Sequence, residues 1–573
     1  MILFSAFTGN AETSAKNEPS AIRTTPPAPK ITDAERQSEL AKRRAKVFAA
    51  MDDKSVLILF SAEPKIYTND VDFLYRQENN LYYLTNLKQN GATLILIKDG
   101  AQQRETLFLP KRNPANETWN GRMYSSDDAA RISGIKTIFD SSELDAFLQA
   151  IKDKTLSSFS AENIYLLLPE SSNDSDGMRE FAKENDFAKN LSSFKVKNAQ
   201  PIFAGLRIVK SPMEQNLLQH AIDITTEAQM RAMATAKNVK WEYETQAEIE
   251  YIFRKRNADY WGYPSIVGCG PNATTLHYIE SQGEVKPNDL LLMDVGAEYD
   301  HLTADVTRTF PVNGKFSKEQ AEIYQIVYEA QETAAKTIKP GAMYREPQRA
   351  AAQVIEQGLA KLGLITGVGA FIPGTEQEVP DGKGGKRTVG RPQSTLWYMH
   401  GWGHWLGMNV HDVGDYSKPF QEGMITTNEP GIYIREDALD YLPKTAEAQA
   451  FVQKIRSAYE KYKNIGVRIE DDMLVTKTGV EWMTKNLPRS ISDIEAFMAK
   501  SSKEFAFRNP QTETNRKIAF FDVDKNFLFG DFRWNLFDTN DFASGKTVKR
   551  GWISSGNKAA TSGLQRAGNF PAE

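Results

Sequence analysis

Apolar residues along the first third of the chain recur with the spacing of alternating helices and strands. Helical spacing over Asp33–Met51 is followed by the apolar runs Val56–Phe60 and Ala92–Ile97, and the turn residues Asp99 and Gly100 end the second run. Similar alternation continues to about residue 198. Strands interleaved with helices in this way predict an α/β domain.

The hydrophobic pattern changes near residue 211. Helical spacing over residues 211–233 and 242–256 gives way to long apolar runs, with further helices expected over 318–338 and 349–362. The expected strands are Leu290–Val295, Thr303–Val312, Met424–Ile434 and Val467–Thr476. Runs of antiparallel strands with separate helices predict an α+β domain.

These patterns divide the chain into four regions. We expect a flexible N-terminal extension over residues 1–45, a smaller α/β domain over 46–205, the α+β domain over 206–498 and a partly disordered C-terminal extension over 499–573. Within the third region, the Gly- and Lys-rich stretch Pro380–Arg391 is expected to be an exposed loop.

Composition and charge exclude several classes of protein. The 573 residues carry 70 basic and 74 acidic side chains, so no basic excess is available to bind nucleic acid. The single cysteine cannot form an intramolecular disulfide, and no apolar run is long enough to predict a membrane-spanning helix. We expect a cytoplasmic protein with neither nucleic-acid nor membrane partners. A periplasmic or secreted location is the alternative if the apolar residues 1–7 belong to an export signal.

Two aspartates lie on apolar strands that a short turn connects. A turn centred between Tyr299 and Asp300 places Asp294 directly opposite Asp305 across the hairpin. Two solvent-facing acids are the alternative, but the flanking Leu290–Met293 is too apolar for a fully exposed strand. Opposed buried carboxylates repel each other unless a cation neutralises them, so this hairpin predicts a cation site.

Histidines are concentrated in one short segment. Three of the six fall within twelve residues, in Met-His-Gly-Trp-Gly-His-Trp-Leu-Gly-Met-Asn-Val-His-Asp-Val-Gly, which covers residues 399–414. They are His400, His404 and His411. Glycines beside them let backbone and metal approach closely. A purely structural cluster is the alternative, although stability alone rarely explains such enrichment. His301, at the predicted hairpin turn, is expected to be exposed.

Two glutamates complete a candidate ligand set. Glu429 lies in Thr-Asn-Glu-Pro-Gly-Ile-Tyr-Ile, and Glu470 lies in Gly-Val-Arg-Ile-Glu-Asp-Asp, where Arg468 projects to the same strand face. The set is Asp294, Asp305, His404, Glu429 and Glu470. Four carboxylates and one imidazole suit divalent ions such as Mn²⁺, and less obviously Zn²⁺ or Co²⁺. Five side chains can hold two metals about 3.5–4 Å apart only if some carboxylates bridge them.

These segments together resemble the pita-bread metallopeptidases, and within them the aminopeptidase P and prolidase group. The resemblance includes Tyr75-Arg76-Gln77-x-Asn79 and Glu117-Thr-Trp-Asn-Gly-Arg122 in the first domain, spans residues 40–498 and fills all five ligand positions. It implies a pita-bread catalytic domain preceded by a creatinase- and aminopeptidase P-like domain. It also implies two divalent metal ions per subunit, with Mn²⁺ preferred and Zn²⁺ or Co²⁺ as alternatives.

The resemblance implies roles for individual residues of the candidate centre. Asp305 and Glu470 would bridge the metal ions, Asp294 would serve one ion, and His404 with Glu429 the other. Glu429 would also act as general base. Of the two further catalytic histidines, His277 would stabilise the tetrahedral intermediate and His411 would contact the substrate carbonyl.

Other positions are implied to support the centre or bind substrate. Tyr263 and Arg468 match residues that support the metal shell, and His400 matches one that lines the proline side of the site. Asp70 lines up with an acid that receives the free amine of the substrate. Trp119 matches an aromatic residue that some bacterial members lend to a neighbouring subunit, which implies a homo-oligomer, either a dimer or a tetramer.

The implied activity is hydrolysis of the Xaa-Pro bond, which releases the first residue of peptides with proline in second position. Prolidase activity on Xaa-Pro dipeptides is the alternative. The segment between His411 and Glu429 contains Lys418 but no arginine. Both aminopeptidases P and prolidases carry an arginine there, which in prolidases helps to anchor the dipeptide carboxylate, so its absence argues against a strict dipeptidase. A non-catalytic binding module of this fold is a minor alternative, disfavoured because no ligand is missing.

Overall fold

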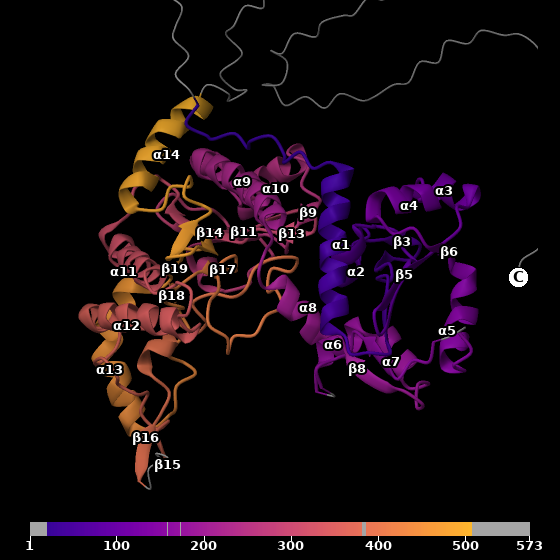
Figure 1. Cartoon of the computed structure of the whole chain (residues 1–573). Helices are drawn as coiled ribbons and strands as arrows, with labels where there is room; N and C mark the ends of the chain where they lie inside the picture. The colour runs from indigo at the N-terminus through magenta and orange to yellow at the C-terminus, as the bar shows by residue number, and fades with distance from the viewer. Residues whose placement is uncertain (1–19, 157–158, 172, 381–384, 507–573) are drawn as a thin grey trace, which may run out of the picture. The chain divides into compact units, whose positions relative to one another are not determined.

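The computed structural model describes residues 20–156, 159–171, 173–380 and 385–506 (Figure 1). Helix α1 (Asp33–Ala50) begins with a capping box, in which the Thr32 hydroxyl accepts from the Glu35 amide and the Glu35 carboxylate accepts from the Thr32 amide. Its buried face includes Val47 and Phe48. The cap and this apolar face account for the helix that the pattern over Asp33–Met51 predicts, so ordered structure begins within the flexible extension expected over residues 1–45.

A mixed six-stranded sheet organises the N-terminal region, residues 33–207, in the strand order β6-β5-β4-β1-β7-β8. Its central strand β1 is fully buried, pairs antiparallel with β4 and pairs parallel with β7, in agreement with the predicted α/β domain. The sheet strands are β1 (Ser55–Phe60), β4 (Thr93–Asp99), β5 (Gln102–Leu109), β6 (Ile138–Asp140), β7 (Asn163–Leu166) and β8 (Lys195–Asn198). A separate hairpin pairs β2 (Ile66–Thr68) with β3 (Val71–Asp72). The helices after α1 are α2 (Asn79–Thr85), α3 (Pro114–Asn120), α4 (Ser126–Ser133), α5 (Leu144–Lys152), α6 (Ser175–Glu180), α7 (Ala182–Ala188) and α8 (Gln200–Arg207).

Short antiparallel sheets and long helices make up the C-terminal region, residues 212–506, and confirm the predicted α+β class. The helices are α9 (Pro212–Thr235), α10 (Glu242–Lys255), α11 (Lys318–Ala335), α12 (Arg345–Leu362), α13 (Ala446–Tyr462) and α14 (Ile491–Ala506). The strands before α11 are β9 (Tyr260–Trp261), β10 (Ile266–Cys269), β11 (Leu290–Val295), β12 (Ala297–Tyr299), β13 (Leu302–Thr303) and β14 (Val306–Pro311). The later strands are β15 (Gln377–Pro380), β16 (Lys386–Val389), β17 (Ile425–Asn428), β18 (Gly431–Tyr433), β19 (Gly466–Arg468), β20 (Asp471–Val475) and β21 (Val480–Trp482).

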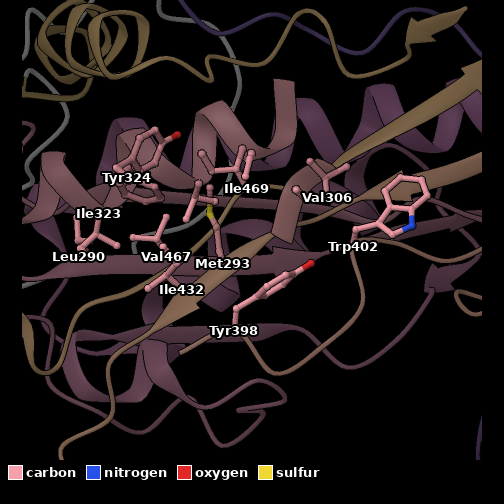
Figure 2. Packing of buried hydrophobic residues seen from close by; sticks show 14 of the residues in the cluster. Leu290, Met293, Val306, Ile323, Tyr324, Tyr398, Trp402, Ile432, Val467 and Ile469 are labelled. Atoms are coloured by element: carbon pink, nitrogen blue, oxygen red, sulfur yellow. The ribbon is translucent and has the colours of Figure 1, made fainter. Parts of the chain in front are cut away.

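The core of the C-terminal region lies between its sheets and α11. Figure 2 shows Met293 and Val306 on two paired strands, Tyr324 on α11, and Val467 with Ile469 from the segment that carries β19. All five are buried. This apolar packing gives the strands that carry the candidate ligands a rigid support.

Three strands that were predicted to be continuous are each divided in two. Asp305 lies in the break between β13 and β14, Glu429 in the break between β17 and β18, and Glu470 in the break between β19 and β20. Between β11 and β12, a Cβ at Gly296 would lie 1.7 Å from the carbonyl oxygen of Ala304, so only glycine permits this close approach. The candidate ligands therefore lie where the regular sheet pattern stops.

The register of the β11–β14 hairpin differs from the prediction. Asp294 pairs with Thr307, not with Asp305, because the turn is formed by Asp300 and His301, one residue later than expected. Both turn residues have positive φ, 54° and 61°, as a two-residue type I′ hairpin turn requires. Strand alternation still places the two aspartates on one face, as diagonal neighbours.

Three further expectations concern the stretch 380–391, the C-terminal extension and membrane-spanning helices. The stretch Pro380–Arg391 is not simply a loop, because β15 and β16 pair across it as a hairpin. Helix α14 continues past residue 498 to Ala506, and the rest of the predicted C-terminal extension lies outside the described residues, as do residues 1–19. None of the described helices is long and apolar enough to cross a membrane.

Candidate metal centre

A cavity of about 520 Å³ opens where the strand breaks converge. Ten of the twelve predicted site residues line it. They are Tyr263, His277, Asp294, Asp305, His400, His404, His411, Glu429, Arg468 and Glu470. Much of the remaining wall is apolar, with Pro264, Ile266, Leu276, Ile279 and Val410. The cavity thus combines a dense group of charged and polar side chains with an apolar side.

Acidic side chains in this cavity lie unusually close together. One ligand atom each of Asp305, His404 and Glu470 lies within 4.8 Å of the other two. The Nε2 atom of His404 is 3.2 Å from Asp305 Oδ2 and 3.3 Å from Glu429 Oε1. Burial and the neighbouring carboxylates raise the pKa of Asp305 and of Glu470 well above the ordinary values. A cation bound between these side chains would therefore stabilise the ionised carboxylates.

Asp294 differs from its neighbours because it has a cationic partner. Arg468 Nη2 lies 2.5 Å from Asp294 Oδ2, and the Tyr263 hydroxyl lies 2.5 Å from Asp294 Oδ1 and 2.6 Å from Asp305 Oδ1. Burial alone would raise the pKa of Asp294, but Arg468 and these hydrogen bonds hold it below its ordinary value. Asp294 is thus oriented by a buried guanidinium before any ion binds.

Two threonines orient ligand side chains, and sequence reasoning missed both of them. The Thr307 hydroxyl donates to Glu470 Oε2 at 2.7 Å, while the Thr427 hydroxyl donates to Glu429 Oε1 at 3.2 Å. Each threonine lies two residues from a candidate carboxylate, Asp305 or Glu429. Strand alternation places such residues on one face, so this i±2 spacing was the signal that could have identified them.

Tyr433 is a third residue that the sequence analysis missed. Its hydroxyl lies 2.9 Å from His400 Nε2 and accepts a hydrogen bond from Arg468 Nη1 at 2.8 Å. It thereby connects the histidine segment with the strand that leads to Glu470. No spacing rule predicted this contact, because residues 400, 433 and 468 come from separate segments.

The histidine rings have defined surroundings. His404 Nδ1 faces the Trp405 carbonyl oxygen at 3.1 Å, which leaves Nε2 to face the carboxylates, as in a metal-ligating histidine. The rings of His404 and His411 lie edge to face, with centroids 4.2 Å apart. Burial lowers the pKa of His400, and burial together with His404 lowers that of His411, so both favour the neutral form.

Two predicted substrate-binding residues lie away from the cavity of the single chain. Asp70 is exposed in the turn between β2 and β3, and Trp119 on α3 is 86% exposed. Neither residue is among those that line the cavity.

The residues of the cavity fit divalent cations. Four carboxylates and one imidazole are the donors that hard and borderline ions prefer, and Arg468 is the only arginine among the cavity-lining residues. The carboxylates therefore carry more negative charge than the surrounding protein balances. A metal-dependent hydrolase is the class of protein that this fold and this donor set define.

Comparisons with known proteins agree with this class and identify the family. Residues 216–477 match the model of metallopeptidase family M24, and residues 40–158 match the aminopeptidase P N-terminal domain. The chain is 34% identical over 471 residues to the Xaa-Pro aminopeptidase of Haemophilus influenzae, across 81% of this chain and 97% of that protein. The chain belongs to metallopeptidase family M24.

Solved structures support the same assignment. A putative aminopeptidase P from Bacillus anthracis is 28% identical, with a TM-score of 0.68 over 81% of this chain and 99% of that chain. Aminopeptidase P from Escherichia coli with the inhibitor Pro-Leu is 30% identical, with a TM-score of 0.65 over 83% of this chain and 100% of that chain. These similarities confirm the pita-bread fold with a preceding N-terminal domain, and a metallopeptidase that binds divalent metal.

Proposed function

We propose that this protein is an aminopeptidase that hydrolyses the Xaa-Pro bond at the N-terminus of peptides whose second residue is proline. The observation that carries the proposal is the convergence of Asp305, His404 and Glu470 within 4.8 Å, in the cavity that His277 and His411 also line. The names of the related proteins, which include Xaa-Pro aminopeptidases, support this choice of substrate.

The centre is proposed to hold two divalent ions, with Mn²⁺ favoured and Zn²⁺ or Co²⁺ as alternatives. Asp294, Asp305, His404, Glu429 and Glu470 would hold the ions. The close contacts of His404 with Asp305 and Glu429 support this set of ligands. When bound, such ions polarise a carbonyl group and activate a water molecule.

The remaining chemistry is assigned to side chains of this chain. Hydrolysis forms a bond between the water oxygen and the carbonyl carbon, breaks the bond from that carbon to the proline nitrogen, and delivers a proton to this nitrogen. Glu429 is the proposed base that accepts the water proton, and the Thr427 hydroxyl orients its Oε1. His277 and His411 are proposed to stabilise the negative charge that develops on the carbonyl oxygen.

The substrate is proposed to lie along the apolar side of the cavity. His400, held between the Gly401 carbonyl oxygen at 2.7 Å and the Tyr433 hydroxyl at 2.9 Å, is assigned to the proline side. Tyr263 and Arg468 are assigned to the support of the metal shell, which their contacts with Asp294 favour. Asp70 keeps its proposed role as the acceptor of the free amine.

A homo-oligomer, either a dimer or a tetramer, is proposed as the working form. Trp119, the β2–β3 hairpin and the segment just after it present exposed apolar side chains, with Ile66 in β2 68% and Leu74 after β3 65% exposed. A second subunit is proposed to receive Trp119 near its own site. Light scattering of the Trp119→Ala variant tests this, because a smaller mass together with a raised KM supports the proposal, whereas an unchanged mass and KM contradict it.

A cytoplasmic location is also proposed. The single cysteine, Cys269, is buried and unpaired, so no disulfide within the chain contributes to the fold, as is usual in reducing compartments. Fractionation of expressing cells tests this location. Recovery from the periplasm or the medium would favour the alternative of an exported enzyme.

The decisive experiment compares an Xaa-Pro-Xaa tripeptide with the matching Xaa-Pro dipeptide after chelation and reconstitution with Mn²⁺. Faster release of the first residue from the tripeptide supports the aminopeptidase, and preference for the dipeptide would favour a prolidase. The Glu429→Gln variant, loaded in the same way, is the control for contaminating peptidases. Metal-loaded protein without turnover of either peptide would overturn the proposal.

A further inference from the structure

His411 is placed in the cavity by its backbone. The histidine loop, defined here as residues 404–412, carries both His404 and His411. In the part of the chain that the structure describes, no hydrogen bond holds the His411 ring. The ring packs edge to face against that of His404. The position of His411 therefore depends on whatever fixes the loop on either side of it.

Side chains of the N-terminal region reach across to the histidine loop just before His411. Arg76 Nη2 donates to the Met408 carbonyl oxygen at 2.6 Å, and Asn79 Nδ2 donates to Asn409 Oδ1 at 2.8 Å. The Nε atom of Arg76 is bound in addition by both carboxylate oxygens of Glu298, at 2.8 and 3.1 Å. The guanidinium is thus fixed from a second direction while it holds the loop.

Just after His411, a buried ion cluster holds the loop. Asp412 accepts a hydrogen bond from Arg207 Nη2 through Oδ1, and Lys210 Nζ lies 3.5 Å from its Oδ2. All three side chains are at most 2% exposed. Arg207 Nη1 also donates to Asn80 Oδ1 at 2.9 Å, so the cluster continues into α2 of the N-terminal region.

The packing around Asp412 leaves the loop little freedom. A Cβ at Gly407 would lie 2.1 Å from Asp412 Oδ2, so the carboxylate rests directly against the loop backbone. The Asp412 amide also donates to the Trp405 carbonyl oxygen at 2.9 Å, which closes the loop on itself. The two ends of the loop are thereby linked to each other and to the N-terminal region.

We propose that the N-terminal region positions His411 for catalysis, with Asp412, Arg207 and Asn79 as positioning residues. The inference rests on the proposed function, in which His411 acts on the substrate carbonyl. Residues on both sides of His411 are held by side chains of the N-terminal region. Loss of either attachment lets the ring move, and a displacement of about 1 Å can reduce activity about a hundredfold.

A double-mutant cycle tests this positioning role. Asp412→Asn is introduced into the full-length enzyme and into the His411→Ala variant, and kcat/KM for an Xaa-Pro tripeptide is measured with Mn²⁺. We expect Asp412→Asn to lower kcat/KM at least about tenfold in the first background and less than about twofold in the second. A residue that acts through His411 has nothing left to act on once that ring is removed.

The matched control is Asp300→Asn. Asp300 is also a carboxylate of the C-terminal region that an arginine of the N-terminal region, Arg36, holds, but its side-chain hydrogen bonds among the described residues are to Arg36 and Tyr82, outside the histidine loop. We expect this variant to lose thermal stability and to keep kcat/KM within about twofold, because neither partner of Asp300 itself hydrogen-bonds the histidine loop in the described part of the chain. If Asp412→Asn does not fold, Asn79→Ala takes its place in the cycle.

The outcomes separate the inference from the proposed function on which it rests. Equal losses from Asp412→Asn, or from Asn79→Ala, in both backgrounds would show a general effect and overturn the positioning role. Full activity of both variants in the first background would overturn it as well. If His411→Ala itself retains full activity, the role of His411 in the proposed function fails instead.

Discussion

Two groups of buried and half-buried acidic side chains in this protein have opposite surroundings. At the junction between the N-terminal and C-terminal regions, Asp412 pairs with Arg207, and Asp300 pairs with Arg36. In the cavity, Asp305 has His404 and other carboxylates as its neighbours, and the Thr307 hydroxyl holds Glu470. Each of these junction acids is paired with an arginine of the protein, and among the described acids of the cavity only Asp294 has such a partner, Arg468.

The pKa values show the consequence of this difference. Burial alone would raise the pKa of Asp412, but Arg207 and Lys210 hold it below its ordinary value, whereas burial and like charges raise those of Asp305 and Glu470. Isolated buried charge is costly, so several uncompensated carboxylates in one site lower the stability of the metal-free protein. A bound cation would offset this cost. The junction stabilises the fold, and the cavity is prepared for metal.

The largest expected effect comes from removing one charge of the cavity group. Glu470→Gln keeps an acceptor for Thr307 but removes a proposed bridging ligand. We expect the variant to bind less Mn²⁺ and to lose more activity than the about 10–100-fold that loss of an outer-shell partner causes. Metal analysis and tripeptide hydrolysis measure both effects.

The exposed Glu481, which pairs with Lys485, provides the control for this experiment. Glu481→Gln changes the same chemical group without touching the cavity and should keep both metal and activity. A Glu470→Gln variant with full metal content and normal turnover would show that Glu470 does not contribute to the centre.

In the absence of metal, substitutions in the two groups should change the free energy of unfolding in opposite directions. Asp412→Asn leaves buried cations without their partner and should lower the free energy of unfolding by about 3–5 kcal/mol. Asp305→Asn should raise it. Because the folded pKa of Asp305 lies above the unfolded value of about 3.9, this carboxyl reduces stability once the pH rises above about 4.

Urea denaturation at neutral pH with a chelator measures this difference. Added Mn²⁺ should then stabilise the wild-type protein more than Asp305→Asn, because ligand binding to the folded state adds stability. If both variants lose stability to the same extent in the chelator, the contrast between junction and cavity is wrong.

Sequence patterns predicted which residues meet at the site better than how they meet. The apolar strands and their acidic residues were sufficient to group Asp294, Asp305, His404, Glu429 and Glu470, and all five line one cavity. The hairpin register was wrong because the turn depends on distant contacts. Arg36 and Tyr82, 264 and 218 residues away from Asp300, hold that residue in the turn.

The strand breaks were equally hidden from sequence reasoning. Pattern alone merges two short strands into one, because Ala304 and Val306 on either side of Asp305, and Ile469 just before Glu470, are apolar and buried. The breaks arise where backbone amides find partners in other segments, as when the Glu470 amide donates to the Thr307 carbonyl oxygen at 3.1 Å. Contacts of this kind belong to the tertiary structure, which a single sequence does not display.

Arg468 offers a smaller test, because it is the one arginine among the described residues that line the cavity. Arg468→Met keeps much of the side-chain volume but leaves Asp294 without its 2.5 Å ion pair. We expect kcat/KM to fall about 10–100-fold, since Arg468 orients a proposed ligand from the outer shell. Raising the Mn²⁺ concentration should restore part of this loss, and no recovery at saturating Mn²⁺ would argue against an effect through the metal site.

The junction also contains His301, which forms no ion pair with a carboxylate of the described residues, and this histidine provides the smallest expected effect. His301, predicted to be exposed, is in fact buried and stacks on Tyr82 with ring centroids 3.7 Å apart. Burial lowers its pKa well below the ordinary value, and Arg76, Lys88 and Arg207 lower it further. Below about pH 6.5 the unfolded chain binds a proton that the folded protein does not, so stability falls as the pH decreases.

His301→Phe keeps a ring against Tyr82 and removes this titration. Between pH 7.5 and 5, the wild-type protein should lose up to about 1.4 kcal/mol more per pH unit than the variant, as measured by urea denaturation in chelator. Any strain from phenylalanine at a φ of 61° shifts the variant equally at every pH, so the difference in slope isolates the imidazole. Equal slopes would mean that His301 already gains its proton in the folded state. The junction would then hold an unpaired charge, and the contrast with the cavity would fail.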